Sequence, residues 1–306
     1  MPQPNECHSQ VKNEQDIDVA AELLDILELE TIDSNLYRGR NDSVHHQRLF
    51  GGQVLAQALA AAINTVDEDR PCHSAHGYFL RPGSPELPVL YRTERIRDGR
   101  SFTTRRIVAL QKGEAIFSMD ASFQVIESGL SHQIPMQEVP MPDTLEDDVA
   151  IAIRNGVTST WLLRPRPFEM RSTAQLGEPQ KNRFENPVWV KFRTPQNSPT
   201  ESPARHPVKR AQRYHQELLA FASDMGFVST SFLPHQEQMS RNDIQMASLD
   251  HALWFHQEVN ITEWLLYVKE TNNAEGARGF NRGAFYSTDG TLVASTMQEG
   301  LMRVRN

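Results

Sequence analysis

One order of elements occurs twice along this chain: an apolar helix, a short strand and a meander of three longer strands. The first pass covers about residues 36–126 and the second about 166–303. Each copy of such an α+β unit leaves an unpaired strand edge, and the edge of a like unit can cover it. The order therefore predicts two helix-wrapped antiparallel half-sheets joined into one continuous sheet. Periodicity alone leaves two independent α+β domains as the alternative.

The helix of the first unit is marked by one apolar stripe. Its apolar positions recur at helical spacing and are Leu55, Ala58, Leu59, Ala62, Ile63 and Val66. Small alanine side chains let a helix approach a sheet closely, which favours a helix wrapped by a sheet over one in a bundle. Strand-like runs separated by turn residues follow at 76–82, 89–96, 101–110 and 115–125.

The second unit repeats this pattern after a proline-bearing linker, in which we expect one or two short helices. Its helix has apolar residues at Leu218, Phe221, Ala222 and Met225, and strands are again predicted beyond it. Sliding the first copy along the chain until Arg106 falls on Arg282 also places Ser122 on Gln298. We therefore divide the chain into a mobile leader (1–17), a first repeat (18–126), a linker (127–165) and a second repeat with the active site (166–306).

Charge and cysteine content exclude several classes of function. A formal net charge of -8 and a pI near 5.8 argue against a nucleic-acid binder, which carries a strongly basic face. Two cysteines, Cys7 and Cys72, supply neither a disulfide framework nor a four-thiol zinc site. The sequence predicts no membrane span and no secretion signal, because it has no long apolar run and no apolar segment in its leader. We expect a cytoplasmic protein that needs no metal and no cofactor.

Catalytic motifs for serine-triad, zinc and nucleotide chemistry are absent, since the chain has no GxSxG, HExxH, CxxC, Walker loop or GxGxxG. Three polar residues in apolar surroundings remain as candidates. Asp224 lies at the edge of the buried face of the second helix, where a carboxylate can act as a base. Ser248 precedes an aromatic strand, and Gln298 lies in the last strand. Taken singly, Asp224 is more typical of a solvated carboxylate, Ser248 of a turn residue, and Gln298 of a sheet residue whose hydrogen bonds are satisfied.

Histidines form a second candidate group in the segment SLDHALWFH. Asp250, His251 and His256 are the closest acid and imidazole cluster along the chain. Neighbouring strand residues point to opposite faces of a sheet, so Asp250 and His251 cannot both enter one site without a bend. His73 and His76 are weaker candidates of the same kind.

Several long segments together resemble one family. They are YRGR, LFGGQVLAQAL, HSAHGYFLRPG, RDGRSFTTRRIVALQKGEAIFSMDASFQ, FASDMGF, SLDHALWFH, EWLLY, ARGFNRGAFYSTDGTLVAST and QEGLMR. In this order they resemble acyl-CoA thioesterase II, the double hotdog thioesterases of bacteria with relatives in peroxisomes. The resemblance runs from about Leu27 to the C-terminus. It implies a double hotdog fold and hydrolysis of acyl-CoA to a free fatty acid and coenzyme A.

The resemblance also implies a site in the second repeat. In the family an aspartate, a threonine and a glutamine bind the water that attacks the thioester carbonyl, and these positions fall on Asp224, Ser248 and Gln298. Serine keeps the hydroxyl of threonine but lacks the methyl group that restrains its orientation. The family resemblance further implies a homodimer or homotetramer, without a covalent enzyme intermediate.

Two rival functions remain at this point. A hotdog hydratase or dehydratase would use Asp250 with His251 or His256 as acid and base, and a non-catalytic module would bind acyl-CoA without turnover. The phosphates of coenzyme A need cationic partners. Candidate arginines for this role are Arg81, Arg97, Arg100, Arg105, Arg106, Arg278 and Arg282.

Overall fold

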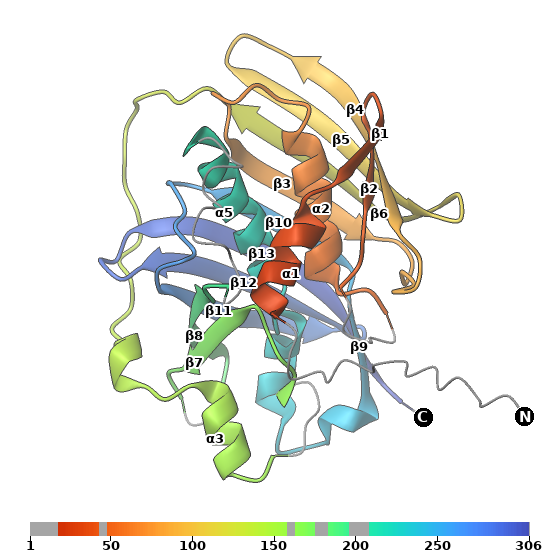
Figure 1. Ribbon diagram of the computed structural model, residues 1–306. Helices are drawn as coiled ribbons and strands as arrows, with labels where there is room; N and C mark the ends of the chain where they lie inside the picture. The colour runs from red at the N-terminus through yellow and green to blue at the C-terminus, as the bar shows by residue number, and fades with distance from the viewer. Residues whose placement is uncertain (1–17, 43–47, 158–162, 175–182, 196–207, 306) are drawn as a thin grey trace, which may run out of the picture.

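One antiparallel sheet of thirteen strands forms the body of the protein (Figure 1). The computed structural model describes residues 18–42, 48–157, 163–174, 183–195 and 208–305. The first half-sheet contains, in spatial order, β1 (Glu30–Asp33), β2 (Leu36–Gly39), β4 (Val89–Asp98), β5 (Phe102–Gln111), β6 (Glu114–Gln124) and β3 (Cys72–Phe79). The second contains β10 (Asp250–Phe255), β13 (Leu292–Val304), β12 (Arg278–Ser287), β11 (Leu265–Glu275), β8 (Glu185–Phe192) and β7 (Phe168–Ser172), with β9 (Ile244–Ser248) on β13.

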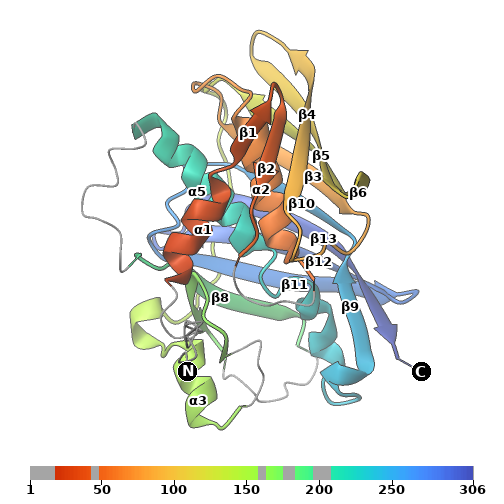
Figure 2. The same cartoon turned by 45° about the vertical axis from the view of Figure 1, so that its right-hand side comes forward.

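The two half-sheets meet edge to edge at β3 and β10. These strands pair antiparallel, with His251 opposite Gly77 and Leu253 opposite Ala75. The prediction of one continuous sheet is thereby confirmed, and the alternative of two independent domains is wrong. Figure 2 shows the strands of both halves curving around the same side, where the helices lie.

Two long helices lie side by side against this sheet, α2 (Gly51–Ile63) and α5 (Val208–Ser223). Every residue of α2 after Gly51 is buried, as expected for an alanine-rich helix enclosed by a sheet and neighbouring helices. The short helix α1 (Val19–Leu27) covers α2 and buries Ala20, Leu23, Ile26 and Leu27. The double hotdog fold is confirmed.

Several elements were not predicted from the sequence. The strands β1, β2, β7 and β9 have four or five residues each, too short for a clear alternation of apolar and polar side chains. Two short helices between α5 and β9, η4 (Val228–His235) and η5 (Arg241–Asp243), were not predicted either. The linker does contain two short helices, as expected, η2 (Pro142–Thr144) and α3 (Asp148–Arg154). Of the elements that were not predicted, β9 matters most for the site because it ends at Ser248.

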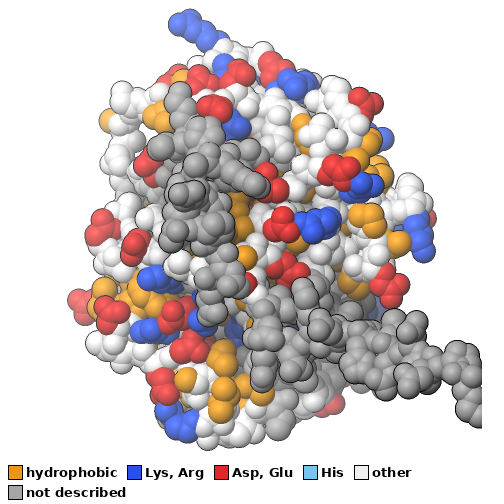
Figure 3. Space-filling model, in the orientation of Figure 1, with side chains coloured by type: hydrophobic (Ala, Val, Ile, Leu, Met, Phe, Trp, Pro, Cys, Tyr) orange, Lys and Arg blue, Asp and Glu red, His pale blue; other side chains and the backbone are white. Residues whose placement is uncertain are grey.

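The aligned arginines of the two units occupy equivalent places on the outer face of the sheet. Arg106 pairs with Asp120 on the neighbouring strand, and Arg282 pairs with Glu270, with all four side chains partly exposed. On the face shown in Figure 3, acidic and basic side chains are likewise interspersed. No helix among the described residues is long and apolar enough to cross a membrane.

Candidate functional site

Asp224 follows the last residue of α5, and Gly226, with a φ of +67°, takes the left-handed conformation that ends this helix. The aspartate is only 6% exposed, so its expected position at the edge of a buried face is confirmed and the reading as a solvated carboxylate is wrong. Its surroundings include the first turn of α2 in the other half of the molecule. The backbone N–H of Gly52 donates a hydrogen bond to the carboxylate.

Gly51 is what lets the carboxylate approach the start of α2 so closely. A Cβ atom at this position would lie 2.7 Å from Asp224 Oδ2 and 3.0 Å from the ring of Phe79. The N-terminus of α2, where backbone N–H groups lack partners within the helix and the helix dipole is positive, therefore faces the aspartate. Sequence reasoning did not assign this role to the GG pair, although paired glycines at a helix start are a signal for close approach.

Gln298 and Ser248 both reach the same oxygen of Asp224. Gln298 Nε2 donates to Asp224 Oδ1 at 2.7 Å, and Ser248 Oγ donates to that atom at 3.3 Å. Both contacts follow from the sheet, because β13 carries Gln298 and pairs with β9, which carries Ser248. The structure thus brings together all three residues that the sequence proposed.

His251 completes the buried group on the far side of Gln298. Its Nδ1 lies 3.0 Å from Gln298 Nε2, and its Nε2 lies 2.9 Å from Ser223 Oγ. The Ser223 hydroxyl donates to the carbonyl oxygen of Ala220, so it accepts from His251 Nε2–H. Nδ1 is then the acceptor for Gln298. Both hydrogens of the glutamine amide are engaged, one with Asp224 and one with His251.

Burial moves the pKa values of the two titratable groups in opposite directions. The pKa of Asp224 is raised to about 6, because loss of solvation outweighs the hydrogen bonds from Gln298, Ser248 and Gly52. Burial lowers the pKa of His251 to about 3, which makes the imidazole neutral at physiological pH. A carboxylate that is ionised at neutral pH but more basic than usual is suited to accept a proton from water.

One acceptor in this group lacks a partner. Gln298 Oε1 is buried and accepts no hydrogen bond within the described part of the chain, although its amide nitrogen is fully engaged. Such an atom is normally satisfied by a protein donor or by water. It can accept a hydrogen bond from a water molecule.

The other histidines and Asp250 lie outside this group. Asp250 accepts a hydrogen bond from the backbone N–H of Glu299, while His256 contacts Ser295 on the exposed face. His73 contacts Ser122, and His76 packs against Trp254. As the alternation rule predicted, only His251 of the adjacent pair enters the site.

A cavity of about 390 Å³ opens beside Ser248 and Gly51. Its walls are mainly apolar and come from the start of α2, the ends of β3 and β9 and the loop after β3. Mostly apolar walls with a few polar groups are typical of sites for small organic ligands. Among the described residues, no three His, Cys, Asp or Glu side chains are grouped so that they could hold a metal ion.

Two family models and several similar proteins identify the family of this chain. The model described as "Acyl-CoA thioesterase" matches residues 191–301, and the model "Acyl-CoA thioesterase N-terminal domain" matches residues 40–124. Acyl-CoA thioesterase 2 of Haemophilus influenzae is 36% identical, covering 94% of this chain and 98% of its own. Acyl-coenzyme A thioesterase 8 of mouse is 39% identical, and the match covers 92% of this chain and 88% of the mouse protein. The crystal structure of acyl-CoA thioesterase II TesB2 of Mycobacterium marinum is 37% identical, with a TM-score of 0.75 over 93% and 99% of the two chains.

Proposed function

The chain belongs to the acyl-CoA thioesterase family and is an acyl-CoA thioester hydrolase, and from this premise we propose that Asp224, Ser248 and Gln298 hold and activate the attacking water. The observation that carries the proposal is the buried Asp224 carboxylate, which has a pKa of about 6 and accepts hydrogen bonds from both other residues. Asp148, the other buried aspartate among the described residues, accepts its hydrogen bonds from the backbone and hydroxyl of Ser172 instead.

In the proposed reaction, the water donates one hydrogen to Asp224 and the other to the unpartnered Gln298 Oε1. Its oxygen attacks the thioester carbonyl carbon while Asp224 accepts the proton. The tetrahedral intermediate then collapses, the carbon–sulfur bond breaks, and coenzyme A leaves as a thiolate. This thiolate takes the proton from Asp224, which returns to the carboxylate form. The products are a carboxylic acid and free coenzyme A, and no covalent enzyme intermediate forms.

The oxyanion of this intermediate needs hydrogen-bond donors. Gln298 cannot supply one, because both hydrogens of its amide are already bonded to Asp224 and His251. The start of α2 lies against Asp224 at Gly51 and Gly52, and no side chain caps this helix. We therefore assign oxyanion stabilisation to the N-terminus of α2, which would make the first repeat part of the working site.

Hydrolysis should depend on pH through Asp224. Since only the carboxylate form accepts a proton, kcat/KM is expected to rise about tenfold per pH unit below pH 6 and to level off above it. His251, with a pKa of about 3, does not titrate in this range. Release of free thiol from palmitoyl-CoA, measured between pH 4.5 and 8.5, tests this profile. A kcat/KM that stays level down to pH 4.5, as expected for an aspartate with the ordinary pKa of 3.8, would contradict the assignment.

Ser248 should contribute less than the other two residues. Its hydrogen bond to Asp224 is the longer one at 3.3 Å, and the side chain is only partly buried. We expect Ser248→Ala to lower kcat about tenfold, as for the loss of one hydrogen bond to a charged group. Ser248→Thr, which keeps the hydroxyl and restrains it, should retain at least wild-type activity. Equal losses of kcat in Ser248→Ala and Ser248→Thr would contradict a role for the hydroxyl group.

The rival chemistry with histidine as acid and base has less support. His251 is neutral and has both ring nitrogens in hydrogen bonds, and His256 lies outside the buried group. Steady-state hydrolysis of short, medium and long acyl-CoA by the wild-type protein separates the remaining readings. Binding without turnover would favour a non-catalytic module.

Further features of the protein are proposals of the same kind. We propose fatty acyl-CoA as the substrate class, the cytoplasm as the compartment and a homodimer or homotetramer as the assembly. We also retain the boundaries 18–126, 127–165 and 166–306 for the first repeat, linker and second repeat, while the predicted mobile leader, 1–17, lies outside the described residues. Separate family matches to residues 40–124 and 191–301 support the division into two repeats.

A further inference from the structure

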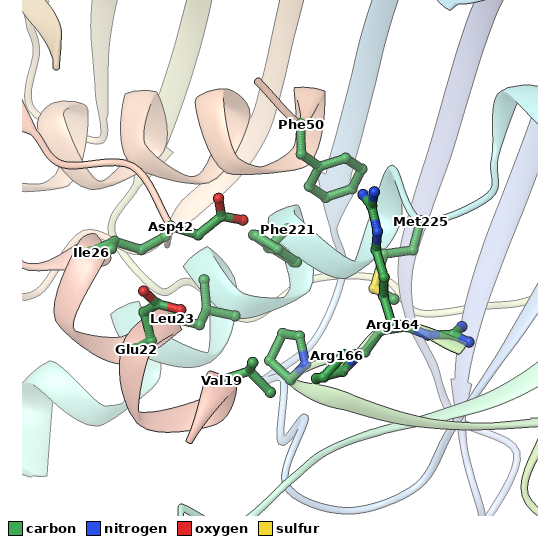
Figure 4. Close-up of a pocket in the computed structure, with 12 residues that line it drawn as sticks. Val19, Glu22, Leu23, Ile26, Asp42, Phe50, Arg164, Arg166, Phe221 and Met225 are labelled. Atoms are coloured by element: carbon green, nitrogen blue, oxygen red, sulfur yellow. The ribbon is translucent and has the colours of Figure 1, made fainter. Parts of the chain in front are cut away.

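Two cavities flank the Asp224 site. The first, named here the β9 cavity, is the space of about 390 Å³ beside Ser248, with Leu49, Phe79, Ile116 and Met246 among its walls. The second, named the α1 cavity, measures about 100 Å³ and lies between α1, the C-terminal end of α5 and the segment 164–167. Figure 4 shows the residues that line it.

A short stretch of chain before α2 separates the two cavities. Leu49 and Gly51 line the β9 cavity, whereas Phe50 between them lines the α1 cavity. The Phe50 ring packs edge-on against Phe221 at 4.9 Å, and both rings are visible in Figure 4. Asp224 lies between the two cavities. Its carboxylate lies close to Gly51, which lines the β9 cavity, and the next residue, Met225, lines the α1 cavity. A thioester placed at Asp224 therefore has one cavity on each side.

The β9 cavity has a cationic mouth. Arg48 and Arg81 line it, and its described lining includes no acidic residue. The two arginine-bearing segments are held together by a hydrogen bond from the Leu49 N–H to the Gly83 carbonyl oxygen. Arg81 also donates to the carbonyl oxygen of Ala115 and lies 3.6 Å from the exposed carboxylate of Glu114. In a chain of net charge -8, this is a local excess of positive charge.

The α1 cavity differs in both charge and size. Its acidic residues Glu22 and Asp42 are matched in number by Arg164 and Arg166, so its lining has no net charge. The remaining lining is apolar and consists of Val19, Leu23, Ile26, Phe50, Pro165, Pro167, Phe221 and Met225. In Figure 4 the side chains of Val19, Glu22, Leu23 and Ile26 from α1 lie along one side of the cavity.

These differences match the two halves of an acyl-CoA molecule, which has phosphates on one side of the thioester and an uncharged chain on the other. We propose that the β9 cavity takes the coenzyme A arm, with Arg48 and Arg81 facing its phosphates, and that the α1 cavity takes the acyl chain. This assignment rests on the proposed function. It singles out Arg81 among the candidates from the sequence and adds Arg48; Arg105, by contrast, is buried against Thr65 and Asp98.

Substrates with and without phosphates test the β9 cavity. Arg48→Gln and Arg81→Gln are each expected to raise KM for palmitoyl-CoA about tenfold, with an effect that shrinks at high salt. For the palmitoyl thioester of N-acetylcysteamine, which lacks the nucleotide, KM should change less than about twofold. Arg92→Gln, a change of an exposed arginine on β4 away from both cavities, is the matched control. Equal changes in KM for both substrates would overturn the assignment of the coenzyme A arm.

Chain-length preference tests the α1 cavity. Val19 is only half-buried on the surface helix α1, so Val19→Trp should fold and narrow the cavity. We expect the ratio of kcat/KM for palmitoyl-CoA over hexanoyl-CoA to fall at least tenfold, whereas Met246→Trp in the β9 cavity should affect both substrates alike. An unchanged ratio in Val19→Trp would overturn the assignment of the acyl chain.

Failure of the proposed function is recognised separately. Titration of free coenzyme A into Asp224→Ala protein, with and without Arg48→Gln, measures binding independently of hydrolysis. Weaker binding in the double variant supports the β9 assignment even if the water-activating residues are wrong. Equal binding overturns it even if Asp224 is the base.

Discussion

Asp224→Ala protein is expected to hydrolyse palmitoyl-CoA at least about 1000-fold more slowly than the wild type, within the range attributed to general base catalysis. The reason is that no other ionisable group in the described site has a suitable pKa: burial holds the pKa of His251 near 3, and Ser248 and Gln298 do not ionise at neutral pH. Initial rates of thiol release at pH 7.5, under saturating substrate, measure the loss in kcat.

Asp224→Asn is the control for folding in this experiment. The pKa of about 6, against 3.8 for a free aspartate, means that the buried carboxylate costs roughly 3 kcal/mol of folding free energy above pH 6. This cost is absent below pH 3.8, where both states are protonated. Asparagine removes this cost of burying a charge. The gain should offset the loss of the hydrogen bond from the Gly52 N–H, which an amide nitrogen cannot accept. We expect inactive protein that melts no lower than the wild type at pH 8; full activity in either variant would remove Asp224 as the base.

Gln298→Met is expected to have the second largest effect, lowering kcat at pH 7 about 100-fold, as for the loss of a strong hydrogen bond to a charged group. Methionine fills a similar space but supplies neither the donor to Asp224 nor the acceptor at Oε1. After burial, the hydrogen bond from Gln298 is the largest influence on the pKa of Asp224, and it lowers that pKa. Without it, the carboxylate becomes harder to ionise and the bound water loses a partner.

The pH profile separates this role from a merely structural one. A hydrogen bond to a charged group contributes about 1.5–3 kcal/mol, which corresponds to roughly one to two pH units. We therefore expect the midpoint of kcat/KM in Gln298→Met to move from about 6 to 7 or above. Met297→Gln, a change on the neighbouring exposed position of β13, is the control and should leave the midpoint in place. A lower rate with an unmoved midpoint would mean that Gln298 does not bond to the carboxylate in solution.

Much of the fold could be predicted because its pattern is local and repeated. The stripe from Leu55 to Val66 already identified α2 as a helix enclosed by a sheet, and the duplication predicted the pairing of half-sheets seen between β3 and β10. Short elements such as β9 could not be predicted, since five residues give too little periodicity. The location of Ser248 beside Gln298 depends on that strand.

The sequence by itself determined the order of elements, the duplication and, through the family resemblance, which three residues to examine as a site. Only the tertiary structure decided their chemistry. Asp224 and Gln298 are 74 residues apart, and the helix start that faces them belongs to the other half of the chain. A pKa depends on which groups exclude water and donate hydrogen bonds in space, whereas periodicity reports only which face of a helix or strand is apolar. For the same reason, the two cavities and their different charges emerge only when distant segments pack together.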